Sequence, residues 1–288
     1  MKKLTCRSAV IVTFALSSLL GTPTWAAEPN PCDLRVSDTA SMYQMEMSEL
    51  LSVGDFKKLE NFMEKQYAEF RAQGNGDHLF DVGGFLNLVA QPDGALLNQW
   101  KKEMPNAFFS NYATGLDRLR QADIIRRGRP MSAVKSNEIN AIDALHKKAR
   151  DAMALAKLAK PDRAIVDAAL IMIDAISSGS GTTAAHLKRG ISVDPKNISA
   201  RLTAISYLDP RWGGSFAEMD DVVTQAKSAK IPAHHVAYLL MAVENNKGSH
   251  YEIIEKNNAK AREHYKRAYD ICNLSNFAKS GLARTTGR

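Results

Sequence analysis

Residues 149–161, ARDAMALAKLAKP, carry the pattern that decides the fold. The small residue Ala149 is followed after four positions by the large apolar Met153, and after three more by the small Ala156. These steps place all three side chains on one face of a helix. Pro161 ends the helix because a proline cannot continue it. The stretch therefore predicts a helix that neighbouring helices approach closely at its alanines, with Met153 filling the gap between them.

The same order of small, large and small residues occurs twice more, at the same spacing of four and three. Pro161 and Pro195 close the first two copies and lie 34 residues apart. A period of this length is typical of antiparallel helix pairs stacked on one another. The second copy is Thr183, Leu187 and Gly190, and the third is Ala261, Tyr265 and Ala268.

The three copies resemble the second helix of a tetratricopeptide repeat, in which small residues allow close helix approach and a large one fills the gap. The Trp, Leu-Gly and Tyr typical of the first helix of such a repeat are missing from the expected places. We therefore predict an all-α fold of antiparallel helix pairs in a short, irregular tetratricopeptide-like solenoid. A non-repetitive helical bundle is the alternative.

Other stretches also predict helices, and none shows the period-two alternation of a strand. In residues 56–70, apolar side chains at steps of three and four form one stripe opposed by charged residues, which is typical of an amphipathic helix. Residues 81–94 are ambiguous. The remaining predicted helices run from Asp38 or Ser41 to about Val53, from Pro92 to Pro105, from about Asn106 to Arg127, and from Ser136 to Lys160.

The N-terminal 26 residues have the composition of a secretory signal peptide of bacterial type. A positive start is followed by an uncharged apolar run over residues 9–20 and by small residues before a cleavage point after Ala26. The run is shorter than the ~20 residues of a spanning helix, so an uncleaved membrane anchor is the less favoured alternative. We predict a periplasmic or secreted protein that leaves the membrane after cleavage. Its parts are a signal peptide (1–26), an irregular lead-in (27–40) and a single helical-repeat domain (41–288).

Charge argues against a nucleic-acid partner. The chain has a net charge of +7, and removal of the three cations Lys2, Lys3 and Arg7 leaves +4. No dense basic block with interleaved aromatic residues occurs, which is the usual signature of nucleic-acid binding.

Two cysteines follow the cleavage point, Cys32 and Cys272, and they lie near opposite ends of the chain. In an oxidising compartment two thiols can form a disulfide. Such a bond would close a very long loop, which the chain-entropy estimate values at roughly 4–5 kcal/mol. The alternative is two unpaired cysteines, one of them buried. No CxxC motif occurs, so a redox enzyme is not expected.

Residues 206–221, SYLDPRWGGSFAEMDD, predict a tight corner between two helices. An Asp-Pro pair ends the incoming helix, and two adjacent glycines permit a positive φ. Ser215 then caps the outgoing helix, with Glu218 three residues later as in a capping box. The motif consists of Pro210, Arg211, Trp212, Gly213, Gly214 and Ser215.

Two side chains of this corner have predicted partners. We expect Trp212 to insert as a wedge into the groove between two helix pairs. Arg211 is expected to bind carbonyl groups at the end of the incoming helix, or to pair with Asp220 or Asp221.

The PRWGGS motif, placed after a helix and downstream of an Ala-rich helical region, resembles a bacterial family known only as domain of unknown function 4034. Two further segments carry the resemblance, LLSVGDFKKLE at residues 50–60 and QWKKEMPNAFF at residues 99–109. The chain departs from the family at residues 124–125, where two isoleucines replace an expected aromatic residue. The resemblance implies a tetratricopeptide-like fold and no assigned reaction, so no catalytic residues follow from it.

No catalytic or metal-binding arrangement is recognisable. His234 and His235 are adjacent and lack the spacing of zinc ligands. The stretch SSGSGTTAAHLKRG lacks the spacing of a phosphate-binding loop, and Thr182 or Thr183 more simply caps the next helix. No GxSxG motif occurs. We therefore predict no catalytic residues, no metal and no cofactor.

These observations favour a non-enzymatic scaffold that binds a protein or peptide on its concave face. One alternative is an immunity or accessory protein for a secreted antibacterial effector. The other is an enzyme that uses Arg211, Trp212 and Asp220.

Overall fold

The computed structural model describes residues 38–73, 94–127, 129, 133–178 and 180–286, and these residues form an all-α fold, as predicted. Twelve α-helices and one 3₁₀ helix make up this described part, and it contains no strand. The helices are α1 (Asp38–Ser52), α2 (Phe56–Gln73), α4 (Gly94–Glu103), α5 (Phe108–Arg126), α6 (Ser136–Ala159), α7 (Ile165–Ser178), α8 (Ser180–Val193), α9 (Ser199–Tyr207), η4 (Pro210–Trp212), α10 (Phe216–Ser228), α11 (Ala233–Ile253), α12 (Asn258–Ile271) and α13 (Asn276–Thr286).

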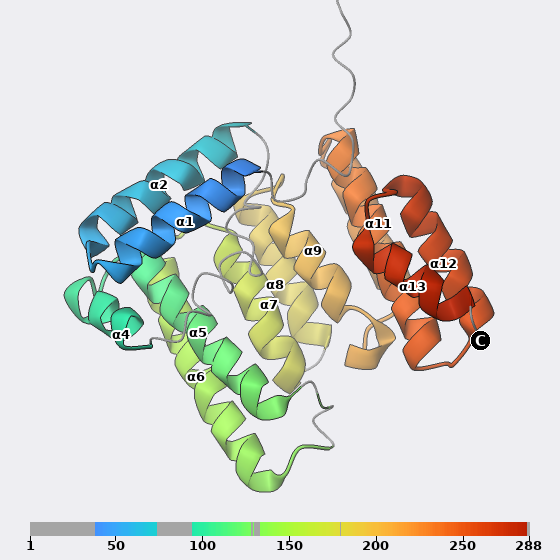
Figure 1. Ribbon diagram of the computed structural model, residues 1–288, viewed down its shortest axis with the longest axis horizontal. Helices are drawn as coiled ribbons and strands as arrows, with labels where there is room; N and C mark the ends of the chain where they lie inside the picture. The colour runs from blue at the N-terminus through green and yellow to red at the C-terminus, as the bar shows by residue number, and fades with distance from the viewer. Residues whose placement is uncertain (1–37, 74–93, 128, 130–132, 179, 287–288) are drawn as a thin grey trace, which may run out of the picture.

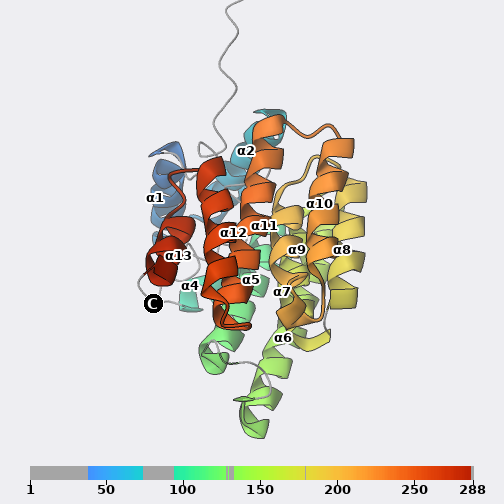
Figure 2. The ribbon, with the colours of Figure 1, turned by 90° about the vertical axis from the view of Figure 1, so that its right-hand side faces the viewer.

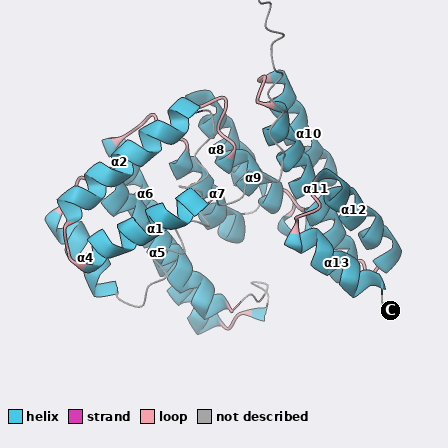
Figure 3. Cartoon of the chain, turned by 45° about the horizontal axis from the view of Figure 1, so that its top comes forward, coloured by secondary structure: helices cyan, strands magenta, loops and turns pink. Residues whose placement is uncertain are grey.

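Helices that follow one another in the chain pack against one another. Such pairs include α1 with α2, α5 with α6, α7 with α8, α11 with α12, and α12 with α13. The α1–α2 pair and the group α11–α13 lie at opposite sides of the molecule, with α5–α9 between them (Figure 1). In the turned view of Figure 2, α10, α11 and α12 run side by side along one face. Figure 3 shows that short loops join most of these helices.

Most predicted helices agree with the structure, and two details are wrong. The first helix begins at Asp38, so the last three residues of the predicted lead-in are helical. α8 begins at Ser180, so Thr182 and Thr183 lie inside the helix and do not cap it. Thr183 instead faces the core and is fully buried. The predicted signal peptide, most of the lead-in and residues 81–93 lie outside the described part of the chain.

One hydrophobic core extends from Met47 in α1 to Val243 in α11. All nine small-large-small residues identified in the sequence are buried. Met153 of α6 faces Gly115 of α5 so closely that a Cβ atom added at Gly115 would lie 2.6 Å from its Cε atom. The glycine therefore lets α5 and α6 approach each other, and Met153 occupies the space that a side chain would fill.

Tyr265 of α12 repeats this arrangement on two sides. A Cβ atom added at Gly248 of α11 would lie 2.7 Å from one edge of the ring, and one added at Gly281 of α13 would lie 2.5 Å from the other edge. The fully buried ring therefore holds α12 between its two neighbours. Gly248 and Tyr251 also have the Gly-x-x-Tyr spacing of a first tetratricopeptide helix. The Trp and Leu of that pattern are absent, because Glu244 and Lys247 stand in their places.

The Tyr265 hydroxyl adds a hydrogen bond to the packing of α12 against α11. It donates to the Glu252 carboxylate over 2.8 Å. Arg284 of α13 donates to both oxygens of that carboxylate over 2.7 and 2.8 Å. The three residues therefore link α11, α12 and α13 beside the ring.

Arg163, in the loop between α6 and α7, joins the α1–α2 pair to the rest of the molecule. Its guanidinium carbon lies 4.2 Å from the Tyr67 ring centroid and 4.3 Å from that of Phe108. Its Nη2 donates to Glu64 of α2. Cation–π contacts with these two rings and with Phe109, together with the ion pair, therefore hold this loop against α2 and α5.

Glu60 makes a second link between α2 and α5. Its carboxylate accepts the backbone N–H of Ser110 over 2.7 Å and that of Phe109 over 3.4 Å, at the first turn of α5. These N–H groups have no partner within the helix. Burial raises the pKa of Glu60 to about 7, against the lowering effect of these backbone hydrogen bonds.

Candidate functional site

The predicted corner exists, and its centre is Asp209. The Asp209 side chain is completely buried at the end of α9. Its Oδ1 atom accepts the backbone N–H of Arg211 over 2.8 Å and the Nε–H of the same residue over 2.9 Å, while Oδ2 accepts from Nη2 over 3.2 Å. The η4 turn folds Arg211 back onto Asp209. The predicted pairing of Arg211 with Asp220, Asp221 or helix carbonyls is therefore wrong.

His250 of α11 approaches the same carboxylate from another helix. Its Nδ1 atom lies 3.2 Å from Oδ1 of Asp209, and its Nε2 atom lies 3.6 Å from Oε1 of Glu255. The imidazole is only 7% exposed and packs edge-on against Phe216, with ring centroids 5.1 Å apart. An Asp–His pair can orient an imidazole for proton transfer. Here the second ring nitrogen faces the Glu255 carboxylate and the ring is enclosed. The Asp209–His250 pair therefore connects the corner to α11.

The backbone of the corner needs both glycines, for different reasons. Gly213 has a φ of +85°, which an L side chain rarely adopts. A Cβ atom added at Gly214 would lie 2.2 Å from the carbonyl oxygen of Leu208. Ser215 caps α10 as predicted: its Oγ accepts the backbone N–H of Glu218 over 3.2 Å and donates to the Glu218 carboxylate over 2.8 Å.

Trp212 is not the buried wedge that we predicted. It is only partly buried. Its ring lies 5.5 Å from that of Tyr207, and the Arg126 guanidinium lies 6.0 Å from its centroid. The η4 turn places the indole over the ends of α9 and α5 and leaves part of it in solvent.

Asp220 does not join Arg211 and Trp212 in a common site. Both of its oxygens accept hydrogen bonds from Lys247 Nζ over 2.8 Å. Its neighbour Asp221 accepts from Gln225 over 2.6 Å. The corner thus contains polar groups that are paired with one another, and Asp220 is engaged elsewhere.

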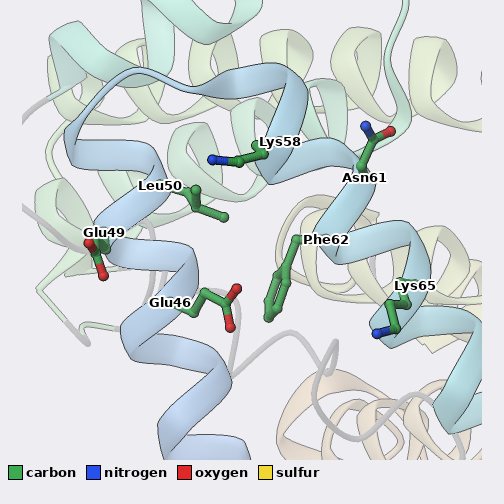
Figure 4. Close-up of a pocket in the computed structure, with 7 residues that line it drawn as sticks. All are labelled: Glu46, Glu49, Leu50, Lys58, Asn61, Phe62 and Lys65. Carbon is green, nitrogen blue, oxygen red and sulfur yellow. The ribbon is translucent and has the colours of Figure 1, made fainter.

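A second candidate site lies between α1 and α2, where the sequence analysis named none. It is an open groove of about 630 Å³. Leu50 and Phe62 point into the space between the two helices, as Figure 4 shows, and both also pack against the hydrophobic core. The lining residues are Glu46, Glu49 and Leu50 from α1, and Lys58, Asn61, Phe62 and Lys65 from α2.

The two rims of this groove carry opposite charge. Glu46 and Glu49 are exposed and form no ion pair within the described residues. Lys58 lies 3.7 Å from Asp55, which directly precedes α2, and Lys65 lies 3.9 Å from Glu69 within α2. The two lysine side chains are 74% and 72% exposed. Exposed ion pairs of this kind contribute little to stability, so both lysines can exchange these partners for charges on a bound ligand. The groove therefore offers an acidic rim, an apolar floor and a basic rim to solvent.

Cys272 is buried at the end of α12 and is disulfide-bonded. Its predicted partner, Cys32, lies outside the described residues. The Cys32–Cys272 pairing therefore stays a prediction.

The described ranges hold neither a metal-binding cluster nor a membrane-spanning helix. They contain no group of three or more His, Cys, Asp and Glu side chains placed to hold a metal ion. None of their helices combines the length and the apolar character needed to cross a membrane.

No protein-family model matches the chain, and no curated protein or solved structure matches it. These comparisons neither support nor refute the resemblance to domain of unknown function 4034, which stays a prediction.

Proposed function

We propose that this chain is a periplasmic or secreted helical-repeat protein that binds a segment of a partner protein and catalyses no reaction. The observation that carries the proposal is the α1–α2 groove, because its apolar floor and charged rims face solvent. Polar rims around an apolar centre are typical of protein-binding surfaces. The groove replaces the concave face as the binding surface that we favour.

The enzyme alternative loses its support at the corner. It needs Arg211, Trp212 and Asp220 around one reacting group, whereas Arg211 binds Asp209 and Asp220 binds Lys247. No feature of the described residues favours the immunity-protein alternative specifically.

A partner search with a charge-reversed variant tests the proposal. The full chain is used as bait in periplasmic extract of its native host, beside the double variant K58E/K65E. We expect a stoichiometric partner with the wild type and its loss with the variant, because two charges of the basic rim are reversed.

The control is K147E/K266E, which makes the same change in net charge away from the groove. Lys147 and Lys266 are 74% and 68% exposed and pair with the nearby Asp151 and Asp270, so their exposure resembles that of Lys58 and Lys65. The control should keep the partner. Recovery of no stoichiometric partner under several growth conditions would contradict the proposed function.

A further inference from the structure

The residues that line the α1–α2 groove are arranged as in a surface that packs against a third helix. Its lining residues fall at positions 46, 49 and 50 of α1, and at 58, 61, 62 and 65 of α2. These steps of three and four define one continuous stripe along each helix. Two adjacent helices with such stripes leave a furrow into which the side-chain ridge of another helix fits. Among the described helices, α1 packs mainly against α2.

The charges restrict which helix fits. A helix seated over Leu50 and Phe62 places one flank above Glu46 and Glu49, and the other above Lys58 and Lys65. Charged residues that flank an apolar seam select partners in this way in coiled coils. A helix with two basic flanks would meet repulsion at the lysine rim, and one with two acidic flanks would meet it at the glutamate rim.

We infer that the groove binds an amphipathic helix of a partner protein that carries basic residues along one flank of its apolar stripe and acidic residues along the other. The inference rests on the proposed function and adds the chemical class of the partner segment. It concerns the surface that α1 and α2 form together, because each rim comes from a different helix.

Three designed helical peptides with the same apolar stripe and length test it. One has lysines on one flank and glutamates on the other, one has lysines on both flanks, and one has glutamates on both. Binding of each labelled peptide to the full chain is measured by fluorescence anisotropy at low salt. We expect the mixed peptide to bind roughly tenfold more tightly than either of the others, since several weak exposed pairs act together. The difference should shrink as salt is added.

Two protein variants make the test reciprocal. E46K/E49K makes both rims basic, so its preference should move to the peptide with two acidic flanks. K58E/K65E makes both rims acidic, so its preference should move to the peptide with two basic flanks. Reversing the direction of a bound peptide exchanges its flanks, but it does not alter any of these expectations. K147E/K266E should keep the wild-type order.

Equal binding of the three peptides to the wild type would overturn the inference, as would variants that keep the wild-type order. So would a dimer that E46K/E49K dissociates in sedimentation, because a second copy would then be the occupant. A native partner whose capture depends on Lys58 and Lys65, without peptide discrimination, would leave the proposed function standing and refute the helix. If the protein discriminates among the peptides but no native partner is recovered, the proposed function is contradicted, whereas the preference of the groove for a helix with mixed flanks stands.

Discussion

The C-terminal helices and the corner at residues 209–215 both join neighbouring helices, but by different means. At the C-terminus, the Tyr265 ring lies between two glycines on the helices beside it. At the corner, the buried carboxylate of Asp209 binds Arg211 and faces His250. The first junction depends on complementary shape, and the second on charge. They should therefore respond to different substitutions.

The comparison also separates two aromatic side chains by their burial. Tyr265 is completely buried because Gly248 and Gly281 leave space for its ring. No glycine among the described residues is placed against Trp212 in this way, and the indole stays partly exposed. The two glycines therefore account for the burial of Tyr265 between α11 and α13.

Tyr265→Ala should have the largest effect, a loss of ~3–5 kcal/mol in the free energy of unfolding. It removes a fully buried ring and leaves a cavity between three helices. Urea denaturation followed by circular dichroism measures the change. Tyr265→Phe is the control and should cost about 1 kcal/mol for the hydrogen bond to Glu252. A loss below 1 kcal/mol for Tyr265→Ala would contradict the shape-based junction.

Glu60 is a second buried carboxylate that joins two helices, and it differs from Asp209 in its partners. Asp209 binds a guanidinium, whereas the two hydrogen bonds to Glu60 come from backbone N–H groups. Its folded-state pKa of about 7 lies above the ordinary 4.5. Between these values the folded state holds a proton that the unfolded state has lost, so stability falls as pH rises. We expect this group to cost roughly 2–3 kcal/mol over that interval.

Glu60→Gln tests this pH dependence. The free energy of unfolding is measured from pH 4.5 to 7 for the wild type, for Glu60→Gln and for the control Glu69→Gln, whose side chain is partly exposed. The decline with pH should be smaller in Glu60→Gln by that amount and unchanged in the control. Parallel curves for all three proteins would count against the raised pKa.

Asp209→Asn should cost about 2 kcal/mol. The amide keeps the shape of the side chain but loses the charge that binds Arg211 and faces His250. The matched control is Asp220→Asn, whose ion pair with Lys247 is half exposed on the aspartate side and should contribute under about 1 kcal/mol. Equal losses in urea denaturation would show that the corner does not depend on charge.

Gly248→Ala should cost about 1–2 kcal/mol, because the new methyl group would overlap the Tyr265 ring unless the helices move apart. Gly181→Ala is the control. A Cβ atom there has no neighbour within 4 Å, so this change should stabilise α8 by about 0.5–1 kcal/mol. Thermal unfolding gives the sign of each change. Opposite signs are expected, and a stabilising Gly248→Ala would break the comparison.

Trp212→Ala should have the smallest effect of the series, about 1 kcal/mol, because only part of the indole leaves water on folding. The measurement is again urea denaturation, beside Tyr265→Ala. A loss as large as that of Tyr265→Ala would restore the wedge that the sequence suggested.

Local sequence signals predicted the helices well, but they did not predict the contacts between residues far apart in the chain. The 3.6-residue period gave α2 and α6, and Ser215 marked the start of α10. The pairing of Asp209 with His250 joins residues 41 positions apart, which no local pattern encodes. The sequence does not show that Asp209 is buried, and it is burial that makes a partner necessary for its carboxylate.

The candidate groove was missed for a related reason. Its lining residues belong to two helices that were both expected, but their relative rotation decides which side chains meet. The stripe of Lys58, Phe62 and Lys65 was visible in α2, as was that of Glu46, Glu49 and Leu50 in α1. Only the packing of the two helices places one stripe beside the other.

The Arg163 contact has a consequence for the order of folding. Its ion pair with Glu64 spans 99 positions, and the bonds from Glu60 to the start of α5 span 49 and 50. Contacts that close such long loops form late, after the local helix pairs. The α1–α2 pair should therefore dock last during folding and detach first in partial unfolding. A ligand in its groove would then slow hydrogen exchange in α1 and α2 more than in α11 and α12.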